Sequence, residues 1–493
     1  MERVLGALAP RDVFYYFEEL SGIPRGSGNE KAVSDYIAGL AKSRGLAVEQ
    51  DTYNNLIIRK PASPGCEDAP VVMLQNHMDM VCEKVPESDL DFEQDGLRLA
   101  IDEQKGTIYA KGTSLGADNG VGLAVALAIM MDDDLVHPPL EIVCTVSEEA
   151  GLAGAVQMDM SSLRAKYMIN SDSYRFDMVQ AGCAGCAYLI NELPIQWTDP
   201  DELDQGAELT IGGLLGGHSG LDVCRQRTNA NKLMGRFLDT LRQAKIPFSL
   251  ADYRCFNKDN AIPRDAACVF ALRAADKGRT AQTVTDLFEA VKAELAVTDP
   301  GVTCSLRWVE RPSRCLTGWD TDTAVRYLML VPDGLFQKYH AYDDPDLGES
   351  SANLGRIILE EDRLVFRSMV RANYLSRKEE VIRKLELLGD LLGMLHHRAS
   401  DAPPWPFDPE SPLLHLLLRC YREMTGREME VSVAHGTCEC GLFKDRVGCE
   451  TVSIGADIRY LHSPLEEVDI ASGGKLYELN IRMLAALAGR EGI

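Results

Sequence analysis

The sequence predicts an α/β protein in which a mostly parallel sheet flanked by helices is interrupted by an inserted α+β domain. Three observations support this prediction. The 493 residues exceed what one hydrophobic core usually serves, so two or three domains are expected. In the first part of the chain, wholly apolar runs alternate with helical patterns, which is typical of parallel sheets. The pattern changes near residue 187 and returns only after the Pro-rich stretch 402–406.

The elements of the first part can be placed in order. Residues 12–45 predict a helix, a loop rich in Pro, Gly and Ser, and an amphipathic helix that ends at a glycine. Residues 48–60 predict a hairpin. Three apolar runs predict strands buried on both faces, and a helix opened by Asp118 or Asn119 separates the first two. These runs are 71–80, 140–149 and 166–173.

The middle of the chain has a different pattern. Between residues 187 and 402, short alternating runs favour antiparallel strands with intervening helices, which predicts an α+β domain. An order of strand, strand and long helix recurs over residues 355–396, which indicates two similar halves. The simplest organisation is one domain made of residues 1–186 and 403–493, with a second domain of residues 187–402 inserted into it.

The chain is acidic, with 75 Asp and Glu residues against 51 Lys and Arg residues and a formal charge of -24. Nucleic acid and anionic membranes are therefore not expected as partners. No signal-peptide pattern opens the chain and no apolar run approaches the roughly 18 residues that span a bilayer, so we expect a cytoplasmic protein without a membrane segment. The 14 cysteines are scattered, which favours buried thiols over a disulfide framework or a redox pair at Cys183 and Cys186.

Polar residues that can bind a metal ion follow the apolar runs, and ligands in open α/β sheets bind beyond the carboxyl ends of strands. His77 and Asp79 lie two residues apart, so an extended chain puts them on the same side, where one can bind metal and the other can orient it. Glu148 and Glu149 must point in different directions, so one can bind metal and the other can act as a general base toward water. Asp172 ends the third run.

Each candidate also has a purely structural interpretation. Asp118 can be a plain helix N-cap, the paired glutamates a solvated loop, Asp172 a turn former, and His462 a structural histidine among nine. In combination, the candidates supply two imidazoles and three carboxylates, enough for two divalent ions and a nearly neutral cluster once a hydroxide is included. Mixed nitrogen and oxygen ligands favour Zn, Mn or Co. The five predicted ligands are His77, Asp118, Glu149, Asp172 and His462.

Ordered motifs along nearly the whole chain resemble the aminoacyl-histidine dipeptidases, also called Xaa-His dipeptidases or peptidase D, within the dinuclear-zinc M20 metallopeptidases. In chain order these motifs are IPRGSGNE, LQNHMDMVCEK, KGTSLGADNGVGLA, TVSEEAGLAGA, INSDS, GGHSG, NAIPR, CECGLF and SIGADIRYLHSP. The resemblance implies a catalytic domain formed by both ends of the chain, with a lid or dimerisation domain between them. It also implies a homodimer that hydrolyses dipeptides with a metal-activated water.

The resemblance assigns a role to each ligand. Asp118 would bridge the two ions, His77 and Asp172 would bind one of them, and Glu149 and His462 would bind the other.

Four further residues take roles from the same resemblance. Glu148 would be the general base, and Asp79 would orient His77. His218, in the GGHSG loop, is similar to a lid histidine that reaches a partner subunit's active site and stabilises the oxyanion. Asn260 is similar to a lid residue that contacts substrate. Without the resemblance, the GGHSG loop could be an ordinary turn and Asn260 an ordinary loop residue.

The chain departs from the family pattern after the INSDS motif. The family usually has glutamates there, whereas this chain has Tyr174, Arg175 and Phe176. An acidic group near the metals is a natural partner for a substrate's free ammonium, so the change predicts unusual dipeptides or N-acyl amino acids as substrates. Two alternatives to a dipeptidase follow: an N-acyl-amino-acid deacylase or related amidohydrolase on the same scaffold, and a catalytically silent binding protein, against which the intact cluster argues.

Overall fold

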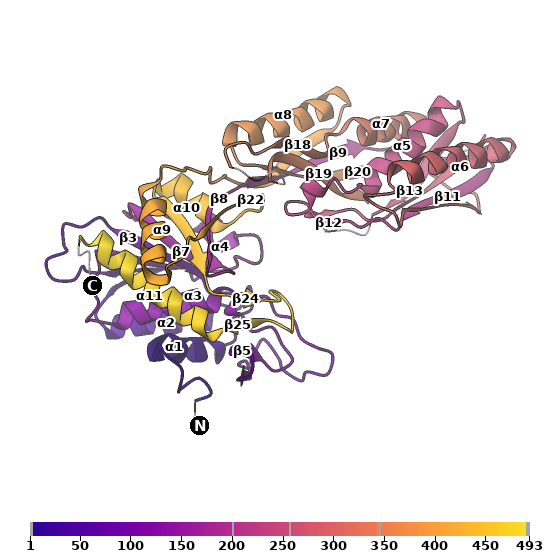
Figure 1. Ribbon diagram of the computed structural model, residues 1–493. Helices are drawn as coiled ribbons and strands as arrows, with labels where there is room; N and C mark the ends of the chain where they lie inside the picture. The colour runs from indigo at the N-terminus through magenta and orange to yellow at the C-terminus, as the bar shows by residue number, and fades with distance from the viewer. Residues whose placement is uncertain (1–2, 200–201, 256–257, 343, 345–346, 490–493) are drawn as a thin grey trace. The chain divides into compact units, whose positions relative to one another are not determined.

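The computed structural model describes residues 3–199, 202–255, 258–342, 344 and 347–489. Within these ranges the chain forms two compact units. The first unit comprises residues up to 182 together with 407–433 and 438–489, and the second comprises 183–406 and 434–437. Figure 1 shows the first unit built from both ends of the colour scale. The first unit is therefore discontinuous. Residues 434–437 belong to the second unit although the segments on both sides of them belong to the first, and no sequence pattern predicted this.

A mixed eight-stranded sheet forms the centre of the first unit, in the order β1-β2-β6-β3-β7-β23-β8-β22. Strands β6, β3, β7 and β23 run parallel, whereas β1, β2 and β8 pair antiparallel with their neighbours. The parallel centre confirms the predicted α/β class. The strands are β1 (Ala47–Gln50), β2 (Leu56–Lys60), β3 (Val72–His77), β6 (Leu140–Thr145), β7 (Tyr167–Ser173), β8 (Met178–Cys183), β22 (Glu430–Ala434) and β23 (Glu450–Gly455).

The parallel strands bring their carboxyl ends to one edge of the sheet. Every residue of β3 and β6 is buried, as expected for strands that are covered on both faces. Their register runs from Val72 opposite Leu140 to His77 opposite Thr145, and β7 pairs with the other side of β3. The polar residues that end the apolar runs therefore gather at this edge.

Helices cover this sheet, and α3 is the most deeply buried of them. It packs on β3 and β7, with α1 and α11 against it, while α10 packs on β23 and on α4. All residues of α3 from Asn119 to Met130 are buried. The helices are α1 (Arg11–Ser21), α2 (Lys31–Ser43), α3 (Ala117–Met131), α4 (Ala153–Gln157), α9 (Pro412–Thr425), α10 (Glu439–Val447) and α11 (Ile470–Leu487).

The start of α3 differs from the prediction. Helix α3 is bounded at Ala117, with Gly116 as its N-cap, one residue before the predicted Asp118, and helical dihedral angles run without interruption only after Asn119. The physical reason is local backbone geometry. Gly116 adopts a left-handed conformation with φ of 64°, and Asp118 and Asn119 lie in the first turn with non-helical dihedral angles.

A small second sheet of the first unit joins the two ends of the chain. Its order is β24-β25-β5-β4, and β25 pairs antiparallel with β5. The loop between β24 and β25 carries His462, so this late segment is fixed against early strands. The four strands are β4 (Leu99–Asp102), β5 (Thr107–Ala110), β24 (Ile458–Arg459) and β25 (Glu467–Asp469).

The second unit is an α+β assembly of antiparallel sheets. Its two larger sheets have the orders β18-β19-β20-β9-β21 and β13-β15-β11-β16, and β10-β17 and β12-β14 form two short pairs. Its strands are β9 (Gly185–Pro194), β10 (Trp197–Thr198), β11 (Gln205–Gly212), β12 (Gly217–His218), β13 (Phe248–Arg254), β14 (Ala261–Ile262), β15 (Ala266–Leu272), β16 (Thr303–Val309), β17 (Cys315–Leu316), β18 (Gly334–Lys338), β19 (Gly348–Leu359), β20 (Arg363–Ala372) and β21 (Leu395–Ala402). Its helices are α5 (Ala230–Gln243), α6 (Lys277–Glu294), α7 (Gly318–Leu330) and α8 (Leu375–Leu391), with short 3-10 turns η1 (Val223–Arg225) and η2 (Ala274–Asp276).

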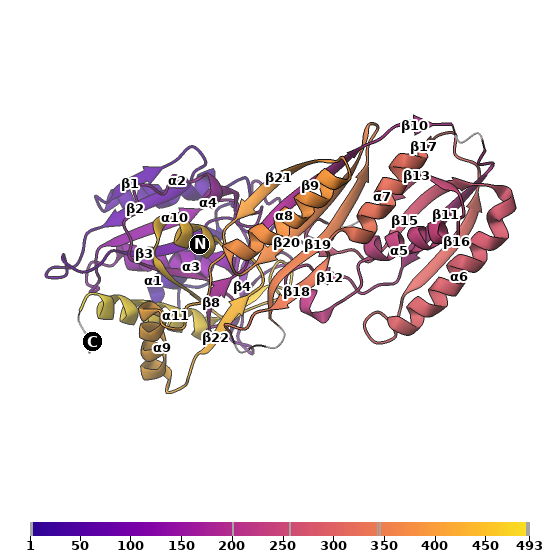
Figure 2. The same cartoon turned by 90° about the horizontal axis from the view of Figure 1, so that it is seen from above.

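Helices α5 to α8 lie along one face of these sheets (Figure 1 and Figure 2). Helix α8 packs on β9 and β20, and α5 packs on β11 and β15. Apolar side chains of both layers, such as Phe237 and Phe270, form a core of the second unit's own. Among the described residues, no helix is long and apolar enough to cross a membrane. The role of this unit as a lid or dimerisation domain stays a prediction.

We expect Gly122→Ala to destabilise the folded protein. A Cβ at Gly122 in α3 would lie 2.3 Å from the carbonyl oxygen of Ser171 and 2.3 Å from Oδ1 of Asn119. Such overpacking costs about 1 to 3 kcal/mol, which a lower midpoint of urea unfolding would report. Gly39→Ala, on the exposed side of α2, is the matched control because a Cβ there meets nothing within 4 Å. Equal midpoints for the two variants would contradict the packing of α3.

Candidate metal centre

Six acidic and histidine side chains converge at the carboxyl edge of the parallel strands. They come from β3, from β7, from the segment after β6, from the first turn of α3, and from the loop between β24 and β25. The six residues are His77, Asp172, Glu148, Glu149, Asp118 and His462. The structure therefore brings together all five residues that the sequence predicted as metal ligands, and Glu148 with them.

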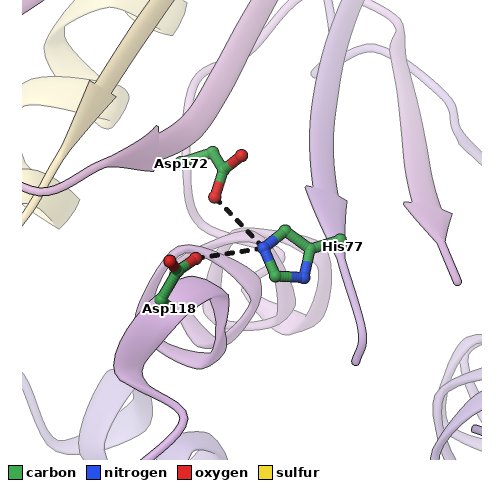
Figure 3. Close-up of side chains that lie close together, drawn as sticks. All are labelled: His77, Asp118 and Asp172. Atoms are coloured by element: carbon green, nitrogen blue, oxygen red, sulfur yellow. Dashed lines mark hydrogen bonds and ion pairs between the residues drawn. The ribbon is translucent and has the colours of Figure 1, made fainter. Parts of the chain in front are cut away.

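The first group of ligand atoms surrounds one nitrogen of His77. Its Nε2 lies 3.0 Å from Oδ1 of Asp118 and 3.2 Å from Oδ1 of Asp172. Figure 3 shows both carboxylates pointing at this nitrogen from different elements, α3 and β7. An imidazole nitrogen and two carboxylate oxygens in one place are a suitable partial ligand set for a divalent cation.

The second group uses the other oxygen of Asp118. Nε2 of His462 lies 3.4 Å from Oδ2 of Asp118 and 2.9 Å from Oε1 of Glu149. Asp118 thus faces His77 with one oxygen and His462 with the other. A carboxylate in this position can be shared between two ions, and the mixed nitrogen and oxygen donors fit Zn, Mn or Co.

Glu148 belongs to a third, overlapping group. Ligand atoms of His77, Glu148 and Glu149 lie within 4.8 Å of one another. The two adjacent glutamates therefore both reach the centre. Oε1 of Glu149 lies 2.9 Å from Nε2 of His462, so the two glutamates differ in their contacts.

Asp79 holds the ring of His77 and the backbone of the two glutamates at once. Its Oδ1 lies 3.3 Å from Nδ1 of His77. Its carboxylate also accepts hydrogen bonds from the N–H groups of Glu148 and Glu149, at 3.0 and 3.2 Å, and from the Ser27 hydroxyl at 2.7 Å. Burial opposes its ionisation, but these hydrogen bonds prevail and lower the pKa of Asp79 below its ordinary value.

Burial and crowding shift the titration of the cluster. Burial raises the pKa of Asp172 to about 7 and that of Glu148 well above its ordinary value, in both cases against the opposing charge of His77. Hydrogen bonds to Asp118 and Glu149 raise the pKa of His462 to about 10. Crowded carboxylates thus require compensating positive charge, which a bound divalent ion can supply in place of protons.

Two buried glutamates that the sequence analysis missed support the centre. Oε1 of Glu30 accepts hydrogen bonds from the N–H and the hydroxyl of Ser147, both at 2.9 Å, and so fixes the turn before Glu148. Oε2 of Glu439 accepts from Gln75 at 2.6 Å and Thr145 at 2.8 Å, and burial raises its pKa to about 7. Both lie within the quoted motifs, IPRGSGNE and CECGLF, but no pattern pointed to their partners.

His218 and Asn260, the two predicted lid residues, lie side by side in the second unit. Strands β12 and β14 pair His218 with Ala261, and the N–H of Ser219 donates to the carbonyl of Asn260 at 2.9 Å. Nδ1 of His218 faces the N–H groups of Gly220 and Leu221, at 3.3 and 3.2 Å. This nitrogen therefore accepts, and the ring proton is on Nε2.

A buried arginine in the same unit lacks an acidic partner. The side chain of Arg371 donates to the Thr437 hydroxyl at 3.2 Å, and its Nε has no hydrogen-bond partner among the described residues. The ionisable groups that influence its pKa are cysteines and a tyrosine and include no carboxylate. Burial lowers the pKa of Arg371, and its charge in turn adds to burial in lowering the pKa of His218. Uncompensated buried cations are costly, so an anionic ligand is a natural partner for Arg371.

Comparison with known sequences identifies the family. The profile of Peptidase family M20/M25/M40 matches residues 73–486. The chain belongs to this family. It is 34% identical over 493 residues to the cytosol non-specific dipeptidase of Escherichia coli strain K12, covering 99% of each chain.

Solved structures of M20 relatives agree with this assignment. The aminoacylhistidine dipeptidase of Vibrio alginolyticus is 31% identical, with a TM-score of 0.86 and 98% coverage of each chain. A tripeptidase of Staphylococcus aureus shares the fold at 14% identity and a TM-score of 0.57, over 98% of this chain and all of its own. The fold of a catalytic and an inserted unit is thus the fold of M20 enzymes.

We expect divalent ions to stabilise the metal-stripped protein. An ion that binds only the folded state stabilises it by about 2.7 kcal/mol at a concentration one hundred times its dissociation constant. Addition of Zn, Mn or Co should therefore raise the midpoint of thermal unfolding. Asp118→Ala, which removes the carboxylate shared by both groups, should lose most of this rise. A wild-type midpoint that no divalent ion changes would contradict the metal centre.

Proposed function

We propose that this protein is a dinuclear-metal dipeptidase of broad specificity. The observation that carries the proposal is the position of Asp118, whose two oxygens face two separate groups of ligands. Identity of 34% along the whole chain to a non-specific dipeptidase supports the substrate class. The similar Vibrio alginolyticus enzyme, an aminoacylhistidine dipeptidase, adds Xaa-His dipeptides to the range.

The proposed ligand sets share one residue. His77 and Asp172 would hold one ion, Glu149 and His462 the other, and Asp118 both. When bound, two divalent ions supply Lewis-acid polarisation of the peptide carbonyl and acidification of a water. Zinc fits the mixed nitrogen and oxygen donors, and manganese and cobalt fit them as well.

Glu148 is the proposed general base. Its carboxylate would take the proton of the attacking water and return it to the amine that leaves. Two features support this role. Its side chain reaches the same group as His77 and Glu149, and its backbone N–H is fixed by Asp79 at 3.0 Å. Asp79 would keep both the base and the His77 ring in position.

His218 is the proposed donor to the oxyanion in a partner subunit's active site. Because two backbone N–H groups occupy its Nδ1, the neutral ring presents a proton on Nε2. Burial, aided by the charge of Arg371, lowers the pKa of His218, so the neutral donor form is favoured at neutral pH. A fixed donor of this kind stabilises negative charge as it develops, without having to reorient.

The second unit also offers groups for the rest of the substrate. Asn260, adjacent to His218 in the β12–β14 pair, is the proposed amide contact. Arg371 is the proposed partner for the substrate carboxylate, since it is buried and uncompensated. We further propose that the second unit serves as lid and dimerisation domain, and that the enzyme is a cytoplasmic homodimer.

Tyr174 and Arg175 bear on the alternative activity, an N-acyl-amino-acid deacylase. Nη2 of Arg175 lies 2.8 Å from Oδ1 of Asp177 and 2.8 Å from Oε2 of Glu430, so two acids neutralise its charge. Arg175 therefore does not present an uncompensated cation to a substrate ammonium. The charge of Arg175 is therefore no argument against dipeptides with a free amine.

The substrate class can be tested with metal-stripped protein. We expect hydrolysis of Xaa-His and other dipeptides only after Zn or Mn is restored, and little or no hydrolysis of N-acetyl amino acids. Product amino acids are measured across the panel at equal substrate concentration. Preference for N-acetyl amino acids would establish the deacylase instead. Binding of two ions without cleavage of any compound would favour a silent protein.

Glu148→Ala should lower kcat by about 10²- to 10⁴-fold because it removes the general base. Both ions should still bind, since Glu148 is not a proposed ligand. The control is Glu103→Ala, which removes an exposed glutamate on the turn between β4 and β5. Near-normal kcat in Glu148→Ala with two ions bound would exclude this assignment.

A further inference from the structure

A buried arginine connects two of the loops that carry the ligands. Arg25 is 1% exposed. Its Nη1 donates to the carbonyls of Met78, at 3.0 Å, and Asp79, at 3.2 Å, and its Nη2 donates to the carbonyl of Gly116 at 2.5 Å. Arg25 therefore joins the segment after His77 to the segment before Asp118.

A buried glutamate joins the Asp118 segment to a third loop. Glu466, which is 3% exposed, accepts hydrogen bonds from four consecutive backbone N–H groups at the start of α3. Oε2 accepts from Leu115 at 2.8 Å and Gly116 at 3.0 Å, and Oε1 accepts from Ala117 at 2.8 Å and Asp118 at 3.4 Å. These N–H groups have no partner within a helix, and a carboxylate is stabilising at this end.

The N-cap residue of α3 explains why a residue distant in sequence, Glu466, accepts hydrogen bonds from the start of this helix. The N-cap is Gly116, which has no side chain to accept from the first turn. Its N–H goes to Glu466, and its carbonyl goes to Arg25. A Cβ at this position would lie 2.6 Å from Nη2 of Arg25, and its φ is 64°. The backbone of Gly116 is thus held by the Glu466 carboxylate at its N–H and by the Arg25 guanidinium at its carbonyl.

Glu466 follows His462 by four residues in the loop between β24 and β25. The His462 side chain is 49% exposed, more than any other predicted ligand, and its φ is 58°. Hydrogen bonds inside the loop are local: Ser463 donates to the Tyr460 carbonyl, and Glu466 N–H donates to Ser463. Glu466 is therefore the member of the loop that connects it directly to the backbone of Asp118.

We propose that Glu466 is a positioning residue that sets His462 against Asp118, and so controls the affinity of the Asp118–Glu149–His462 group for its ion. This inference rests on the proposed dinuclear centre. The other group depends on a different contact, because Arg25 connects the backbone after His77 to Gly116. Loss of Glu466 should consequently weaken the ion at His462 more than the other ion, which keeps His77 and Asp172.

The test is a titration of metal-stripped full-length protein with Zn, followed by calorimetry and by competition with a chromophoric chelator. Wild-type protein should bind two ions. Glu466→Gln places an amide donor where a carboxylate oxygen now accepts two N–H groups. We expect one of the two ions to lose about 10- to 100-fold in affinity, the usual effect of removing an outer hydrogen-bond partner, while the other ion loses less.

Glu467→Gln is the matched control. Glu467 is the next residue and is similarly buried, at 6% exposed, but its carboxylate bonds to Lys105, Thr107 and Arg459 instead of the α3 start. It should bind both ions as wild type does. The thermal midpoints of the three metal-free proteins are compared as well, because a residue that only caps α3 would lower that midpoint and leave ion affinities unchanged.

The role of Glu466 would be overturned if Glu466→Gln kept wild-type affinity for both ions or lost affinity equally for both. The dipeptidase proposal would still stand in that case, provided that wild-type protein binds two ions. If Glu466→Gln does not fold, Glu466→Asp, which keeps the charge and withdraws the acceptor, is titrated in its place with the same criteria. A wild-type chain that binds no ion would overturn the metal centre itself, and this inference with it.

Discussion

Carboxylates repel one another strongly when they are crowded away from water, and the carboxyl edge of the sheet crowds several of them together. At an effective dielectric constant of 20, two unit charges 4 Å apart interact by about 4 kcal/mol. Three carboxylates of the cluster lie within a few ångströms of the imidazoles of His77 and His462; they belong to Asp118, Asp172 and Glu149. Such a cluster persists in a folded protein only if positive charge is delivered to it, and divalent ions deliver the most charge in the least space.

The surroundings of the cluster divide its acids into two kinds. Burial opposes the ionisation of Asp79, but contact with the His77 ring and hydrogen bonds from backbone N–H groups lower its pKa. Burial raises the pKa of Glu466, although four backbone N–H groups donate to its carboxylate. Glu439 has only the Gln75 amide and the Thr145 hydroxyl on one oxygen, and its other oxygen has no partner. Its pKa is accordingly raised to about 7 by burial. Burial thus prevails at Glu439 and Glu466, whereas the contacts of Asp79 prevail over its burial.

Much of the fold and the predicted ligand set could be inferred from sequence because the signals are local. Strands β3 and β7 carry His77 and Asp172 near their carboxyl ends, and the Glu148–Glu149 pair follows β6. Neighbouring parallel strands must end at one edge of the sheet. The α/β class and the inserted α+β unit were recognisable for the same reason. The start of α3 lies one residue before the predicted Asp118 because Gly116, a left-handed residue, replaces a side-chain cap.

The supporting residues could not be inferred because their partners are remote. Glu466 contacts backbone groups about 350 residues earlier, and an N–H group leaves no mark on a sequence. In the sequence Arg25 is indistinguishable from an ordinary loop arginine, and only the structure shows that it donates to the carbonyls of Met78 and Gly116. The tautomer of His218 depends on the turn geometry of the next three residues. Contacts of this kind become visible only in three dimensions.

The discontinuity of the first unit has a consequence for the order in which the protein is made. Residues up to 182 emerge from the ribosome first, and most of the second unit follows before the segment with His462. A growing chain therefore carries His77, Asp118 and Asp172 without the partner histidine. Translation therefore completes the cluster only after the second unit has been made, and until then a chain on the ribosome has one of the two histidines.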